Sequence, residues 1–168
     1  MQHRPDIESS YFVIMDMKYP DEMNAKDLPK SGEDQTVEYA KPAYYAVQNL
    51  TRIFDNNLIS IKNFNYTVTT KKPLSVFAFQ DRQTKLNIIT IWFDGEIPSD
   101  SNTQTQSDFT FTNVRFEQPV YVDLRMGKVF EIPESAYSAK DNDYTFRSIP
   151  CYDSPILVAD RSNTYLQK

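Results

Sequence analysis

Beyond residue 58, apolar and polar positions alternate with a period of two, which is the pattern of short, half-buried β-strands. Clusters of Asn, Asp, Ser, Gly and Pro separate the segments that carry this alternation. The predicted strands cover residues 58–69, 74–80, 87–93, 109–116, 120–124, 129–132, 144–149 and 156–159. About eight short strands within about 100 residues are typical of an antiparallel β-sandwich, so the predicted fold class is mainly β.

The clearest hairpin covers residues 120–132, where Gly127 lies in a tight turn that tolerates a positive φ. Two polar segments, 99–107 and 140–143, have the composition of surface loops. No repeat of the length found in solenoids or propellers is visible, so these repeat architectures are excluded.

The N-terminal third follows a different pattern. Residues 10–17 form a dense apolar run, which predicts a strand that is covered on both faces. Residues 18–38 show neither helical nor strand periodicity and carry many charges, so we expect a long loop there. Residues 41–55 predict an amphipathic helix. We therefore divide the chain into an N-terminal part, 1–57, and a sandwich domain, 58–168.

The predicted helix begins at Pro42, because proline has the φ angle that is favoured at the first helical position. Its apolar residues Ala43, Val47, Leu50 and Phe54 recur at the spacing of one helical face. We expect this face to pack against a partner element and the opposite side to face water.

Composition narrows the classes of function. The chain has 168 residues, of which 40% are hydrophobic, and this suits one globular domain. Its net charge of -5 argues against a nucleic-acid partner, since phosphate binding relies on a basic surface. Three glycines cannot supply a glycine-rich phosphate loop. The chain has a single cysteine, Cys151, and a single histidine, His3. With one residue of each kind, an intrachain disulfide, a zinc site or a histidine relay is hard to build.

No apolar run approaches the roughly 18 residues that a membrane-spanning helix needs, so no membrane partner is expected. The first ten residues also lack the apolar core of a signal peptide. We expect no metal and no cofactor.

Exposed aromatic rings are the candidate ligand-binding residues. Carbohydrate-binding sandwiches hold sugars on aromatic side chains, because the apolar face of a pyranose packs on a π surface. Trp92, Tyr137, Tyr144 and Tyr152 are the candidates. Trp92 is expected on the outer face of its strand. For all four, a role in the core or at a domain contact is the favoured interpretation, because tyrosines spread over many strands are half-exposed by chance.

Four phrases of the sequence resemble a known family: KPAYYAVQNLTRIFD at 41–55, ITIWFDGEIPSDS at 89–101, PVYVDLRMGKVFEIP at 119–133 and IPCYDSPILVAD at 149–160. Together they resemble the C-terminal segment of TIM-barrel glycoside hydrolases, chiefly of gut-type Bacteroidetes. In that family the last barrel strand and helix are followed by an accessory β-sandwich.

The resemblance implies that residues 10–17 correspond to the eighth barrel strand, residues 41–55 to the eighth helix and residues 58–160 to the accessory sandwich. The family's two catalytic glutamates follow the fourth and seventh barrel strands, so both precede the part that is similar to this chain. Proteins of this family are typically exported to the periplasm or the cell surface.

Three functions are compared. The leading hypothesis is a non-catalytic accessory module of a polysaccharide-degrading glycoside hydrolase, which buttresses the catalytic barrel. The sandwich is expected to bury the apolar face of the helix at an interface formed by Val47, Leu50 and Phe54 or their neighbours, so that barrel and sandwich move as one body. The alternative is an independent carbohydrate-binding module that uses exposed aromatics to bind a polysaccharide. A self-contained hydrolase with Asp94 and Glu96 is less favoured, because Asp-Gly-Glu is ordinary turn composition. The expected partner is a catalytic barrel or another copy of the chain.

Overall fold

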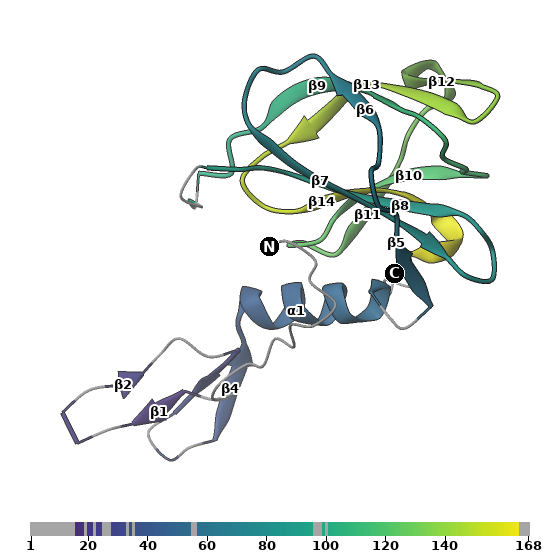
Figure 1. Cartoon of the computed structure of the whole chain (residues 1–168). Coiled ribbons are helices and arrows are strands. Elements are labelled where there is room, and N and C mark those ends of the chain that lie inside the picture. The colour runs from purple at the N-terminus through teal and green to yellow at the C-terminus, as the bar shows by residue number, and fades with distance from the viewer. Residues whose placement is uncertain are drawn as a thin grey trace.

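The computed structural model describes residues 16–18, 20–21, 23–24, 28–32, 34, 36–54, 57–95, 99 and 101–164 (Figure 1). Within these ranges the chain is mainly β, with one α-helix, α1 (Pro42–Ile53), and every strand pair is antiparallel. The predicted fold class is therefore confirmed. The predicted strand at 10–17 lies almost entirely outside the described residues.

The strands that follow the helix form two sheets. The larger sheet has six strands in the order β11-β10-β14-β8-β7-β5, and the smaller has four in the order β12-β13-β9-β6. The bounds are β5 (Leu58–Ser60), β6 (Tyr66–Val68), β7 (Leu74–Asp81), β8 (Asn87–Phe93), β9 (Thr105–Phe111), β10 (Pro119–Asp123), β11 (Lys128–Glu131), β12 (Tyr137–Lys140), β13 (Asp143–Cys151) and β14 (Ile156–Asp160). Two short 3-10 helices, η1 (Glu134–Ala136) and η2 (Arg161–Asn163), complete this part.

The main core lies between the two sheets. Alternate residues of β8, Ile89, Ile91 and Phe93, point into it, as the alternation predicts, and are at most 3% exposed. The smaller sheet contributes Phe109, Phe111 and Phe146, whose rings contact one another. Burial of these large aromatic side chains removes apolar surface from water, which is the main stabilising term in folding.

Helix α1 adds a third layer on the outer face of the larger sheet (Figure 1). Ile53 packs with Phe79, Ile88 and Leu157 in a second buried cluster. Residues on both faces of β10 and β14 are therefore buried, and these strands consist almost entirely of apolar residues. The prediction that one face of each strand is exposed to solvent is wrong for these central strands, because the helix covers their outer side.

Three segments differ from the predicted strands. The segment 58–69 forms two strands, β5 and β6, which belong to different sheets and are separated by a turn in which Asn63 has a φ of 55°. Strand β9 begins at Thr105, within the predicted loop 99–107, because its first residues pair with Cys151 and Pro150 of β13. Strand β12 is an additional edge strand. Its side chains after Tyr137 are exposed, so it lacks the buried alternation on which the prediction relied.

The predicted loop at 18–38 is wrong where the structure describes it. Strands β1 (Met17–Lys18) and β2 (Met23–Asn24) pair with each other, and β3 (Pro29–Ser31) pairs with β4 (Val37–Ala40). These hairpins project beyond the first turn of the helix (Figure 1). The residues of β4 are mostly exposed, so backbone pairing rather than a buried face defines the strand, and no periodicity marks it.

A buried carboxylate connects this N-terminal part to the helix. The side chain of Asp16 is fully buried, accepts a hydrogen bond from the backbone N–H of Ser31 at 3.3 Å, and forms an ion pair with Lys41. Lys41 immediately precedes α1. The contact therefore fixes the β3–β4 hairpin at the start of the helix.

Candidate functional site

Trp92 lies on the outer face of β8, as predicted, and is half-buried. Its ring stacks on Phe77 of the neighbouring strand β7, with centroids 5.4 Å apart and an interplanar angle of 21°. One face of the indole is therefore occupied by Phe77. The structure accounts for Trp92 as a cross-strand aromatic pair, which stabilises a sheet.

Tyr137 and Tyr144 lie on neighbouring strands of the smaller sheet. Their rings stack at a centroid distance of 6.5 Å, and both pack against the core between the sheets. The hydroxyl of Tyr144 donates a hydrogen bond to the backbone carbonyl of Phe116 at 2.8 Å. Both side chains are half-buried and contribute to the core, so they do not form an open platform together with Trp92 on the other sheet.

Tyr152 is 1% exposed and lies within the core, which leaves no ring face for a ligand. The structure therefore places Tyr152 in the core, the role that the sequence favoured, and not at a sugar-stacking surface. Burial, together with the negative charge of Asp123, raises the pKa of Tyr152 to about 12. Burial also raises the pKa of the neighbouring Tyr121 well above its ordinary value. Both hydroxyls stay neutral at physiological pH.

Of the expected interface residues, Val47 and Leu50 lie on one flank of α1, beside its buried face, whereas Phe54 follows the helix and packs on the sandwich. The helix turns toward the sheet through Asn49 and Ile53, which are 7% and 3% exposed. Leu50 is 45% exposed, because one residue step rotates it by about 100° from Asn49. Val47 is half-buried. Phe54, just after the helix, packs edge-on against Phe79 at 5.2 Å.

The expectation that the sandwich buries Leu50 is therefore wrong, whereas it is correct for Phe54. The apolar spacing did not predict which face of α1 is buried, because the residue at the centre of the buried face, Asn49, is polar. The side-chain nitrogen Nδ2 of Asn49 donates a hydrogen bond to the carbonyl of Leu124 at 2.9 Å, which satisfies both groups in the buried layer.

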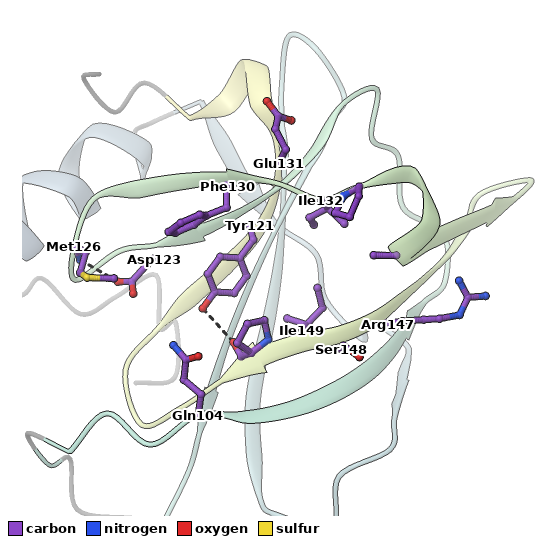
Figure 2. Close-up of a pocket in the computed structure, with 13 residues that line it drawn as sticks. Gln104, Tyr121, Asp123, Met126, Phe130, Glu131, Ile132, Arg147, Ser148 and Ile149 are labelled. Carbon is purple, nitrogen blue, oxygen red and sulfur yellow. Dashed lines mark hydrogen bonds between the residues drawn. The ribbon is translucent and has the colours of Figure 1, made fainter.

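A cleft of about 390 Å³ opens between the hairpin β10–β11 and the middle of β13 (Figure 2). Its wall includes the rings of Tyr121 and Phe130, whose centroids are 6.0 Å apart at an interplanar angle of 56°. The hydroxyl of Tyr121 donates a hydrogen bond to the carbonyl of Pro150 at 3.1 Å across the cleft. Because that bond fixes the Tyr121 ring, the aromatic wall is preorganised.

Polar groups occupy other parts of the cleft. Asp123 is 2% exposed, and its Oδ1 accepts a hydrogen bond from the backbone N–H of Met126 at 2.9 Å. Gln104 lies at the mouth of the cleft (Figure 2). Arg147 and Glu131 also line it, but both side chains point away from Asp123 in Figure 2, and Glu131 forms an ion pair with Arg161.

This arrangement can bind a ligand, but it does not frame a pair of catalytic carboxylates. Glycoside hydrolysis requires two carboxyl groups that face each other across the scissile bond. Asp123 and Glu131 are the acidic residues of the cleft, and they point to different sides. Asp94, the other acid considered, accepts hydrogen bonds from Ser75 and from the N–H of Gly95 in an exposed turn, while Glu96 lies outside the described residues.

The pattern of the hairpin 120–132 contains the signal for the cleft. Its turn fixes the register so that Tyr121 pairs with Phe130, on the face opposite to Val120 and Val122. The sequence predicted this hairpin and its turn at Gly127, but not that Tyr121 and Phe130 lie together on one of its faces.

The described residues contain no cluster of three or more His, Cys, Asp or Glu side chains that could hold a metal ion. Within the same ranges, no helix is long and apolar enough to cross a membrane. No protein-family model, curated protein or solved structure matches the chain. The resemblance to glycoside hydrolases therefore depends on the sequence phrases alone.

Proposed function

We propose that this chain is the non-catalytic, C-terminal accessory β-sandwich module of a polysaccharide-degrading glycoside hydrolase of the TIM-barrel type, and that it buttresses the catalytic barrel. The observation that carries the proposal is the apolar flank of α1. The helix already packs on the sandwich through Ile53, and yet Ala43, Val47 and Leu50 form a second apolar stripe beside the buried face.

Exposed apolar side chains are concentrated on the N-terminal elements that include this flank. Eight large hydrophobic side chains are exposed in the described part of the chain, and five of them lie on β4 and α1. The five are Val37, Tyr39, Tyr44, Tyr45 and Leu50. Apolar residues gathered on two adjoining elements are typical of a surface that another domain covers.

The buttressing role follows from how α1 is held. Ile53 and Phe54 contact the sheet through apolar packing, and Asn49 adds a hydrogen bond to Leu124. A barrel that packs on the flank of this helix would be fixed to the sandwich through a rigid element rather than through a flexible linker. Two domains of one chain move as one body only when the interface between them is large and apolar.

The experiment uses the (β/α)8 barrel encoded in frame with this chain or in the neighbouring gene. We would purify the barrel with the wild-type chain and with Leu50→Glu, and measure the melting temperature of each complex by calorimetry. We expect the wild-type chain to raise the melting temperature of the barrel, and Leu50→Glu to abolish that gain, because it places a charge in an apolar contact.

Gln48→Glu is the matched control, since Gln48 lies about 160° around α1 from Leu50 and is not part of the apolar stripe. It should leave the complex unchanged. The proposal is wrong if no such barrel is encoded, if the barrel gains no stability, or if the purified chain alone hydrolyses 4-nitrophenyl glycosides.

A further inference from the structure

The cleft between β10–β11 and β13 is the second place where exposed apolar side chains gather. Met126 and Phe130 are 47% and 46% exposed, and both line it. The cleft has a volume of about 390 Å³, at the lower end of the range for small-molecule sites. A single six-membered ring with its substituents fits such a space, whereas a long chain must lie largely outside it.

The aromatic wall favours a ligand with a flat, apolar face. Tyr121 is nearly buried and fixed by its bond to Pro150, so Phe130 presents the accessible ring beside it. Strand β11 is an edge strand of the larger sheet, which leaves the cleft side of Phe130 open to solvent. Aromatic rings bind the C–H face of a ring through dispersion and desolvation.

The polar groups favour hydroxyls rather than a charged group. Asp123 offers only acceptors, and a carboxylate has about four lone-pair positions, of which Met126 N–H occupies one and the Tyr152 hydroxyl is close to another. Gln104 supplies both a donor and an acceptor at the mouth. Hydroxyl groups can satisfy both side chains, since each hydroxyl donates and accepts.

The charges around the cleft are balanced. Asp123 is negative, Arg147 at the rim is positive, and Glu131 is paired with Arg161. Arg125 and Asp123 both influence the Tyr152 hydroxyl electrostatically. Because one carboxylate and one arginine of opposite charge line the cleft beside the paired Glu131, a ligand without net charge is favoured.

The backbone of β13 opens the cleft. The pairing of β13 with β9 is interrupted between Phe146 and Ile149, where Ser148 has a φ of 56°. A left-handed conformation is unfavourable for a residue with a side chain. The carboxylate of Asp108 stabilises this bulge by accepting a hydrogen bond from the Ser148 N–H at 2.8 Å. Bulges of this kind often redirect a strand next to a binding site.

We infer that the cleft binds one neutral pyranose-sized polyol, with its apolar face on Phe130 and its hydroxyls on Asp123 and Gln104. The inference does not depend on the proposed buttressing role. The cleft and the flank of α1 use different residues, so each can fail without the other.

The test is a titration of the full chain, followed by NMR of its backbone amides. The probes are the methyl α- and β-pyranosides of glucose, galactose, mannose and xylose, with glucosamine and glucuronate as charged comparisons. We expect at least one neutral glycoside to bind with shifts concentrated at residues 121–133 and 147–150. Phe130→Ala should weaken binding by about five- to ten-fold, which matches the loss of one aromatic contact.

Gln104→Ala is the second variant, and it should also weaken binding, because Gln104 is exposed and can be replaced without loss of the fold. Tyr39→Ala removes an aromatic ring that is 58% exposed and distant in sequence from the cleft, and should leave binding unchanged. No binding of any neutral glycoside at 50 mM, binding of glucosamine or glucuronate alone, or equal affinity of Phe130→Ala and wild type would each overturn the inference.

Discussion

Gly127 lies directly against the side chain of Asn49. A Cβ atom added at Gly127 would lie 2.7 Å from Nδ2 and 2.9 Å from Oδ1 of that asparagine. Gly127 also has a φ of 65°, so it is in the left-handed region. One glycine thus meets two requirements: it forms the turn between β10 and β11, and it lets the helix approach closely enough for Asn49 to reach Leu124.

Gly127→Ala is expected to lower the free energy of unfolding by about 2 to 4 kcal/mol, since it combines backbone strain with displacement of a buried hydrogen bond. Urea denaturation followed by circular dichroism measures this change. Gly95→Ala is the matched control, because Gly95 has a φ of 79° but no atom within 4 Å of an added Cβ. It should cost only about 1 to 2 kcal/mol. Equal losses of unfolding free energy in the two variants would show that the contact with Asn49 does not contribute to stability.

The two sides of α1 should respond differently to truncation. Ile53→Ala removes a side chain that is 3% exposed between helix and sheet, and we expect a loss of about 2 to 4 kcal/mol. Leu50→Ala truncates a side chain that is 45% exposed, and should change the stability of the isolated chain by less than about 0.5 kcal/mol. Chemical denaturation of both variants makes the comparison. Similar losses would place Leu50, rather than Ile53, in the contact with the sandwich.

Alternation predicted the strands whose residues face one core. Strand β8 has the predicted bounds, and its inward residues Ile89 and Ile91 are buried as expected. The short strands β3 and β4 could not be predicted in this way. Strand β4 pairs through its backbone while most of its side chains stay exposed, and β3, Pro-Lys-Ser, is too short to show an apolar alternation. The burial of both faces of β14 depends on the position of α1, and a single strand's pattern contains no information on that position.

The helix illustrates why the site was harder to predict than the fold. Apolar spacing selected Val47 and Leu50, whereas the buried face is centred on Asn49. A buried asparagine is favourable only because the carbonyl of Leu124, 75 residues away in sequence, accepts its hydrogen bond. The cleft residues Tyr121 and Phe130 are likewise brought together by tertiary structure, since the register of β10 and β11 places them opposite each other.

Asp160 should make the protein sensitive to acid. Its carboxylate accepts hydrogen bonds from the N–H groups of Glu117, Gln118 and Ser162 and from the Ser162 hydroxyl, at 2.6 to 3.0 Å. Burial alone would raise the pKa of Asp160, but these hydrogen bonds outweigh it and lower the pKa below the ordinary aspartate value. The charged form therefore stabilises the fold at neutral pH, and this contribution is lost as the pH falls below about 4.

Asp160→Asn tests this pH dependence, because an amide cannot accept all four bonds. We expect the variant to lose about 1 to 3 kcal/mol at pH 7 and to show a smaller further loss than the wild type between pH 5 and pH 2. Urea midpoints across that range measure both effects. Parallel pH curves for the two proteins would contradict the assigned role.

Cys151 should report directly on opening of the core. It is the one cysteine of the chain and is 0% exposed, and burial raises the pKa of its thiol to about 12. The thiolate is the reactive form, so a disulfide reagent such as DTNB should leave the folded protein unmodified for hours at pH 8 and react within seconds in 6 M urea. Rapid reaction without denaturant would mean that the sandwich core opens locally near β13.

Amide hydrogen exchange of α1 tests most directly whether helix and sandwich form one body. If they do, the amides of residues 50–53 exchange only through global unfolding, with the same free energy as those of β8. Destabilising the sandwich core with Ile91→Val should then lower both values together. Exchange of the helix within seconds, while β8 remains protected, would show that α1 is not part of the folded body and would contradict the account.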